Sequence, residues 1–170
     1  MILQDLRLVT QFVFLIAWGA VLSSCVSVSL ENKTVKRSAD AQAQSPAAPF
    51  EKINAEQVDG AWKNSKTGNI ISFLSDCTKN TDPSLESLHY ETLQGLQDEK
   101  ILSENRITYL ERDALRSSIT GKVDGIVSSL DLLIFKKNGC SYVLSFISTP
   151  KTRNEDLPYF EKFLNGFRVP

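Results

Sequence analysis

Apolar and polar residues in the second half of the chain alternate as they do in β-strands. Two apolar runs, 126–135 and 140–149, flank Lys136-Lys137-Asn138-Gly139. Asn-Gly supplies the left-handed backbone conformations of a tight turn. In the second run, apolar side chains alternate between two faces, with Tyr142, Leu144 and Phe146 on one and Val143 and Ile147 on the other. The pattern predicts a hairpin whose second strand is central and covered on both faces.

Shorter apolar runs predict further strands before this hairpin. Residues 61–64 and 69–74 are separated by a turn that contains Gly68, and they predict a first hairpin. Three more strand segments are predicted, at residues 101–102, 107–110 and 114–120. Charged turns at 104–106 and 111–113 separate them. Residues 121–125, bounded by two glycines, predict the next bend.

Helical spacing of apolar residues appears twice. Asp82-Pro83 predicts a helix N-terminus, and the helix is expected to end near Gly95. Its apolar positions are Leu85, Leu88, Leu93 and Leu96. The second helix follows the acidic pair Glu155-Asp156, and Gly166 helps to end it. Its apolar stripe, expected to pack on the sheet, is Phe160, Phe163, Leu164 and Phe167.

The N-terminal region is the most apolar part of the chain, with no charged residue from 8 to 30. It ends in Leu22-Ser23-Ser24-Cys25, which resembles the lipobox of bacterial lipoproteins. The resemblance implies a signal peptide over 1–24, cleavage before Cys25, and a membrane anchor of diacylglycerol and palmitate on that cysteine. Two alternatives remain open: an uncleaved transmembrane helix, or a plain secretory signal in which Cys25 is incidental.

Residues 25–49 form a lipidated N-terminus followed by a stretch rich in Ser, Ala, Gln and Pro. This composition predicts a disordered tether, and residues 50–170 are expected to form the folded domain. The resemblance also implies where the lipoprotein is sorted. In such proteins an Asp after the lipidated cysteine retains the lipoprotein in the inner membrane, and this chain has Val26 at that position. The outer membrane facing the periplasm is therefore favoured over the inner membrane.

Charge is nearly balanced, with a formal net charge of -1 at pH 7. A balanced chain provides no general attraction for polyanions, so nucleic acid is not an expected partner.

The predicted order of elements is a hairpin, a helix, four antiparallel strands and a helix. It resembles the PsbP-like α/β sandwich over about residues 58–169. The residues that carry this likeness are Arg116, 121–125, 140–146 and 159–168. The resemblance implies an α+β fold with a mainly antiparallel sheet of about six strands, flanked by two helices. Members bind partner proteins or have no assigned role, so no catalytic residue is implied.

Three cysteines are present. With Cys25 used for lipidation, Cys77 and Cys140 remain as a pair in an oxidising compartment, which predicts a disulfide. Two separate free thiols are the alternative.

Candidate catalytic chemistry is sparse. The single histidine, His89, is expected at the surface or boundary of the first helix. Neither a phosphate-binding glycine loop nor a metal-ligand spacing is evident, so no cofactor or metal is expected. An envelope hydrolase acting on cell wall or lipid would have to use carboxylates such as Glu86, Glu91 or Asp131.

The favoured interpretation is a non-enzymatic domain that binds another envelope protein. Its binding surface is expected in the loops at 121–125 or 149–153, because loops on a rigid sheet often carry function. Lys151 and Arg153 are the candidate contacts. Reversing their charges is expected to weaken binding and to leave stability nearly unchanged.

Overall fold

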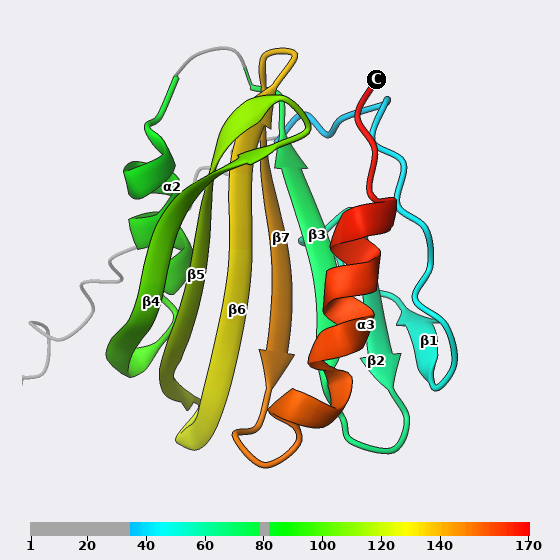
Figure 1. Cartoon of the computed structure of the whole chain (residues 1–170), viewed down its shortest axis with the longest axis vertical. Helices are drawn as coiled ribbons and strands as arrows, with labels where there is room; N and C mark the ends of the chain where they lie inside the picture. The colour runs from blue at the N-terminus through cyan, green and yellow to red at the C-terminus, as the bar shows by residue number, and fades with distance from the viewer. Residues whose placement is uncertain (1–34, 79–81) are drawn as a thin grey trace, which may run out of the picture. The chain divides into compact units, whose positions relative to one another are not determined.

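A seven-stranded antiparallel sheet between two helices forms the domain (Figure 1). The computed structural model describes residues 35–78 and 82–170. The sheet order is β1-β2-β3-β7-β6-β5-β4. The strands are β1 (Phe50–Ile53), β2 (Gly60–Asn64), β3 (Ile70–Asp76), β4 (Gln97–Tyr109), β5 (Arg112–Val123), β6 (Ile126–Lys137) and β7 (Cys140–Ser148). The helices are α2 (Leu85–Leu93) and α3 (Arg153–Gly166). The predicted α+β architecture is confirmed, with seven strands in place of about six.

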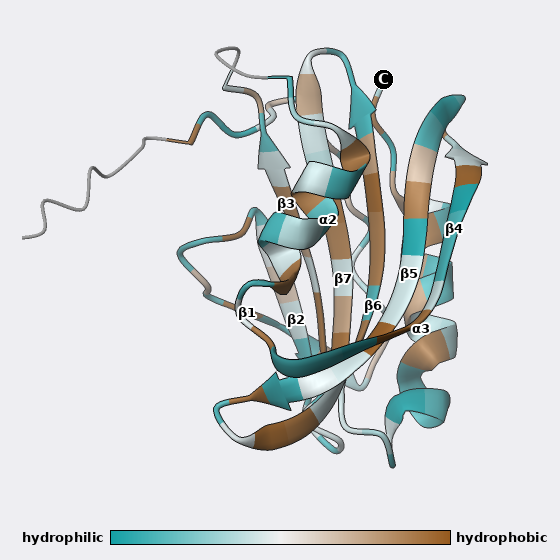
Figure 2. Ribbon diagram, turned by 90° about the vertical axis from the view of Figure 1, so that its left-hand side faces the viewer, coloured by the Kyte–Doolittle hydropathy of each residue, from teal (hydrophilic) through white to brown (hydrophobic). Residues whose placement is uncertain are grey.

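The two helices cover opposite faces of the sheet, and each has its own core cluster. Under α3, the predicted stripe of Phe160, Phe163, Leu164 and Phe167 is buried. It packs on aromatic residues of the sheet such as Phe135. Figure 2 shows hydrophobic residues along β6 and β7, the strands at the centre of this sandwich. Apolar burial on both faces explains why both strands could be recognised in the sequence.

The first helix begins later than expected. Its N-cap is Ser84, whose Oγ accepts a hydrogen bond from the backbone N–H of Ser87 at 3.1 Å. The prediction of a cap at Asp82 is therefore wrong by two residues. Leu85 and Leu93 are buried against β5 and β6, as their spacing predicts.

The β4 strand is continuous, so the expected turn at 104–106 is wrong. It pairs with β5 in unbroken register from Ser103 to Tyr109, after two irregularities near its start. The hairpin closes through Leu110 and Glu111, both with positive φ. Residues on an exposed edge strand need no apolar alternation, and for this reason the pattern concealed the strand.

The bend expected over 121–125 is confined to Asp124 and Gly125, because residues up to Val123 belong to β5. Gly121 is a packing glycine: a Cβ there would lie 2.7 Å from Cδ2 of Leu96. The Asn138-Gly139 turn, in contrast, is as predicted, with both residues at positive φ.

Residues 35–49 pack against the domain, so the predicted disorder of this segment is wrong. The backbone of Gln42 forms two hydrogen bonds of 2.9 Å with Arg168, and Ala41 and Ala43 contact the core. The carbonyl of Lys36 accepts from the N–H of Cys77 at 2.7 Å. The predicted signal peptide, the predicted lipidation site Cys25 and the part of the predicted tether up to residue 34 lie outside the described residues. Neither α2 nor α3 is long and apolar enough to cross a membrane.

Cys77 and Cys140 are joined by a disulfide, as predicted. Cys77 follows β3 and Cys140 begins β7, the strand next to it in the sheet, and their Cα atoms are 4.1 Å apart. The bond therefore closes the end of the β3–β7 ladder.

Candidate functional site

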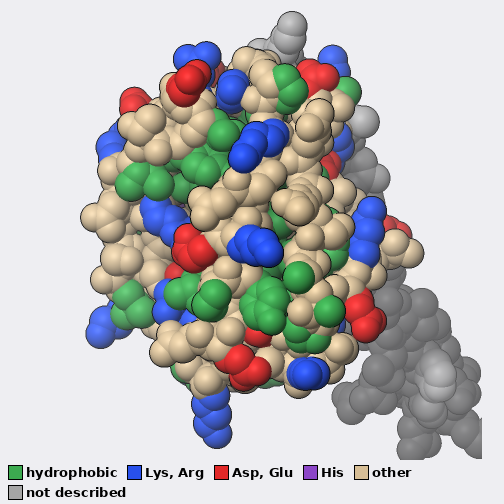
Figure 3. All heavy atoms as spheres, turned by 45° about the vertical axis from the view of Figure 1, so that its right-hand side comes forward, with side chains coloured by type: hydrophobic (Ala, Val, Ile, Leu, Met, Phe, Trp, Pro, Cys, Tyr) green, Lys and Arg blue, Asp and Glu red, His purple; other side chains and the backbone are tan. Residues whose placement is uncertain are grey.

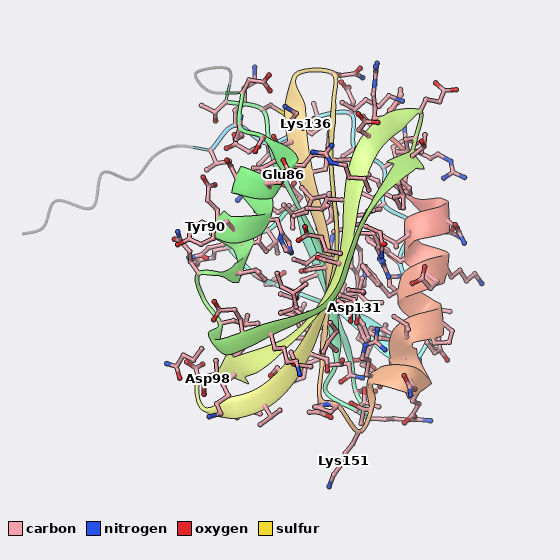
Figure 4. All side chains as sticks on the ribbon, turned by 60° about the vertical axis from the view of Figure 1, so that its left-hand side comes forward. Glu86, Tyr90, Asp98, Asp131, Lys136 and Lys151 are labelled. Carbon is pink, nitrogen blue, oxygen red and sulfur yellow. A yellow bond between two sulfur atoms is a disulfide. The ribbon has the colours of Figure 1, made fainter. Side chains whose placement is uncertain are left out.

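The two candidate contacts in the 149–153 loop differ in their surroundings. Lys151 is exposed and points into solvent (Figure 4). Arg153 instead holds the buried carboxylate of Asp131, with Nε donating at 2.8 Å and Nη2 at 2.6 Å. These hydrogen bonds raise the pKa of Arg153 above its ordinary value. Reversing the charge of Arg153 would leave Asp131 buried and unpaired, so the expectation of unchanged stability is wrong for this residue.

The candidate carboxylates do not form one site. Glu86 is exposed on α2 and pairs with Arg106 of β4. Glu91 is also exposed on α2. Asp131 lies on the other side of the sheet, beneath α3, where Arg153 neutralises it (Figure 4). Asp131 therefore cannot share one substrate with Glu86 or Glu91 in the way that the two carboxylates of a glycoside hydrolase do.

His89 is buried, which contradicts its predicted place at the surface or boundary. Its Nε2 lies 2.9 Å from Oγ of Ser117 on β5. Its Nδ1 lies 3.0 Å from Oε2 of Glu104 on β4. A sequence signal for this burial exists, because Leu85, His89 and Leu93 are spaced by four and share one helix face.

Ser117, His89 and Glu104 are connected in the same order as the nucleophile, the general base and the orienting carboxylate of a catalytic triad. Ser117, however, is only 1% exposed. It lies in β5, whose backbone is paired with β4 on one side and β6 on the other. Its neighbouring N–H groups are therefore used by the ladders and are not available to stabilise an oxyanion. In this arrangement His89 fastens α2 to β5 and β4.

A partly apolar groove lies beside His89. We call it the α2–β4 groove; it has a volume of about 560 Å³, and it is lined by His89, Tyr90, Leu93, Gln94, Leu96, Glu99 and Ile101. Tyr90 is 70% exposed and Ile101 49% exposed, and the adjacent Leu102 is 56% exposed. Figure 4 shows Tyr90 on the outer side of α2. Exposed apolar side chains gathered at a groove are typical of interaction sites.

The outer surface of α3 is different in character. A shallow hollow there, of about 630 Å³, is lined mostly by polar residues: Asn154, Leu157, Pro158, Glu161, Lys162 and Asn165. Figure 3 shows positive and negative side chains intermingled on the side of the molecule seen in that view. Sequence reasoning placed the binding surface in loops and missed the α2–β4 groove, because its β4 residues were not recognised as one strand.

Comparisons with known proteins bear on the fold. No family model and no curated protein matches the chain. The solution structure of cyanobacterial PsbP (CyanoP) from Synechocystis sp. PCC 6803 is similar, with a TM-score of 0.56 and 11% identity over 88% of this chain and 99% of that one. A crystal structure of a protein of unknown function, PA94 from Pseudomonas aeruginosa, has a TM-score of 0.50 and 14% identity over 75% and 85% of the two chains. The PsbP-like fold is thus confirmed, and identities this low establish the fold alone.

Proposed function

We propose that the chain is a bacterial lipoprotein whose PsbP-like domain binds another protein of the cell envelope without catalysis. The anchor is the lipid on Cys25, and the outer membrane facing the periplasm is the proposed location. The lipobox resemblance supports this location, and so does the disulfide, because stable disulfides are typical of oxidising compartments.

The observation that carries the binding function is the α2–β4 groove. Its apolar lining combines the buried Leu93 of α2 with the exposed side chains of Tyr90 and Ile101. Glu99 places a carboxylate beside these apolar groups. The partner that fits presents an apolar side chain to the groove and a basic group to Glu99.

Affinity purification of the tagged protein from crosslinked cells tests this site. The double variant Tyr90→Asp and Ile101→Asp should lose the partner that the wild type captures, because charges replace apolar side chains that line the groove. Both side chains are exposed, so the fold should be retained. Lys151→Glu is the matched control and should capture the partner normally. The groove is the wrong site if the double variant captures as well as the wild type, or if Lys151→Glu alone abolishes capture.

An envelope hydrolase is the second candidate, and the Ser117–His89–Glu104 chain is the one observation that favours it. This function requires α2 to move away so that Ser117 becomes accessible. The labelling experiment described in the Discussion separates it from the binding function.

A further inference from the structure

The outer edge of β4 is the longer of the two unpaired strand edges of the described sheet. β4 has 13 residues and is the last strand of the sheet, with β5 on one side only (Figure 1). Its first half carries register irregularities near Gln97–Lys100 and Ile101–Ser103, features that turn an edge away from further pairing. The half from Ser103 to Tyr109 is regular and carries no such protection.

The backbone groups that face outward in this half follow from the hairpin. Tyr109 and Arg112 close a two-residue turn, so they exchange hydrogen bonds with each other. Alternation along the strand then directs Ile107, Asn105 and Ser103 toward β5. The N–H and C=O groups of Glu104, Arg106 and Thr108 consequently point to the open edge, and an extended strand can bind them.

We propose that this edge binds a second copy of the same chain, antiparallel, with the two-fold axis passing through Asn105. In this register Glu104 of each copy lies opposite Arg106 of the other, and each pair exchanges its backbone hydrogen bonds. The result is one continuous sheet across two domains. This inference goes beyond the proposed function, since it uses the regular half of β4 and not the α2–β4 groove.

The charges of Glu104 and Arg106 favour a second copy of the chain as the partner, and they also favour the register centred on Asn105. Opposite charges directly across an antiparallel pair stabilise it, and like charges destabilise it. Moving the axis to Glu104 places two carboxylates opposite each other, and moving it to Arg106 does the same with two guanidinium groups. The side chain of Arg106 is 58% exposed and that of Glu104 is 38% exposed. Both are therefore accessible to a second copy.

Existing contacts leave these two side chains able to pair. Glu104 meets His89 through Oε2, and Arg106 meets Glu86 through Nη2. Oε1 of Glu104 and Nη1 of Arg106 have no partner among the described residues, so they are the atoms that the second copy would use. Ile107, 40% exposed on the other face of β4, would also be covered.

Sedimentation analysis of the purified full chain in detergent, over a concentration series, tests the dimer. The wild type should dimerise reversibly. Arg106→Glu should raise the dissociation constant by about tenfold or more, because it places like charges opposite each other. The swap Glu104→Arg with Arg106→Glu should restore dimerisation. Lys122→Glu, an equal charge change on β5 outside the paired stretch, should have no effect. Circular dichroism checks that each variant is folded.

Cysteine crosslinking tests the register, in a full chain that also carries Cys25→Ala. Asn105→Cys should form a disulfide with itself across the axis, where the Cα atoms of a non-hydrogen-bonded pair are about 4.5 Å apart. Ile107→Cys is the matched control: its two copies would lie about 13 Å apart along the strands, so they should not crosslink. A wild type that is monomeric at every concentration, an Arg106→Glu variant that dimerises normally, or crosslinking at 107 but not at 105 would each overturn the proposal.

Discussion

Asp156 shows how one buried side chain can join distant parts of the fold. Its carboxylate accepts hydrogen bonds from Asn64, Thr67 and Asn69, which lie on or beside the β2–β3 hairpin. The residue itself is in the first turn of α3 and is 1% exposed. The sequence predicted only an acidic helix start, because the donors are about 90 residues away along the chain.

Replacing Asp156 with Ala should lower the free energy of unfolding by about 3 kcal/mol, since two buried amides and one partly buried hydroxyl lose their acceptor. Urea denaturation measures this loss. Glu155→Ala is the matched control, because Glu155 is exposed in the same helical turn. Equal stabilities of the two variants would contradict the role assigned to Asp156.

Tyr109 provides a pH-dependent test of packing at the tip of the β4–β5 hairpin. Its hydroxyl donates to the carbonyl of Leu164 at 2.6 Å, and burial raises the pKa of Tyr109 from 10.0 to about 12. Between these values the unfolded chain releases the proton and the folded chain keeps it. Stability should therefore fall as the pH rises from about 10 to 12. The melting temperature of Tyr109→Phe should fall less steeply with pH over this range than that of the wild type. An identical dependence of melting temperature on pH would contradict the burial of this hydroxyl.

Helices and strands with buried apolar side chains were predicted correctly from the sequence, whereas strands with mostly exposed side chains were not. The β6–β7 hairpin and α3 were recognised because their apolar residues repeat with the period of the structure they form. β1 was missed because Phe50 is the one buried residue among its four. β4 was split into pieces because all but the last of its residues are exposed, so backbone pairing and not side-chain burial determines its conformation.

The attachment of α2 to the sheet decides between binding and hydrolysis. If the Ser117–His89–Glu104 chain is structural, a fluorophosphonate that labels activated serines should leave Ser117 unmodified in the folded protein. His89→Ala should lower the melting temperature, because it removes the two contacts that His89 itself makes between α2 and strands β4 and β5. Mass spectrometry after labelling measures the first outcome. Stoichiometric modification of Ser117, lost in His89→Ala, would favour the hydrolase.

For the whole molecule, the sequence indicated the PsbP-like fold and the disulfide. The structure corrected the prediction of which side chains are free at the surface. Arg153 is paired with the buried carboxylate of Asp131 and is not a free loop charge. The α2–β4 groove could not be predicted, because it joins a helix to the edge strand that the pattern had divided.

Anchoring is the whole-molecule property that links the domain to its proposed location. Cys25→Ala should abolish incorporation of labelled palmitate and release the protein from membranes, since the acyl chains provide about 0.8 kcal/mol of binding for each buried CH₂ group. Label in the wild type, lost in the variant, is the expected result. A wild type that takes up no label would exclude the lipoprotein assignment and leave the binding domain to be tested by itself.

The most direct test of the binding function is photo-crosslinking in intact cells. A benzoylphenylalanine residue at position 90, at the rim of the α2–β4 groove, should form a covalent adduct with one envelope protein. The same residue at position 151, on the exposed loop, should form none with that protein. Adducts from position 151 and none from position 90 would contradict the proposal that this domain binds its partner through the groove.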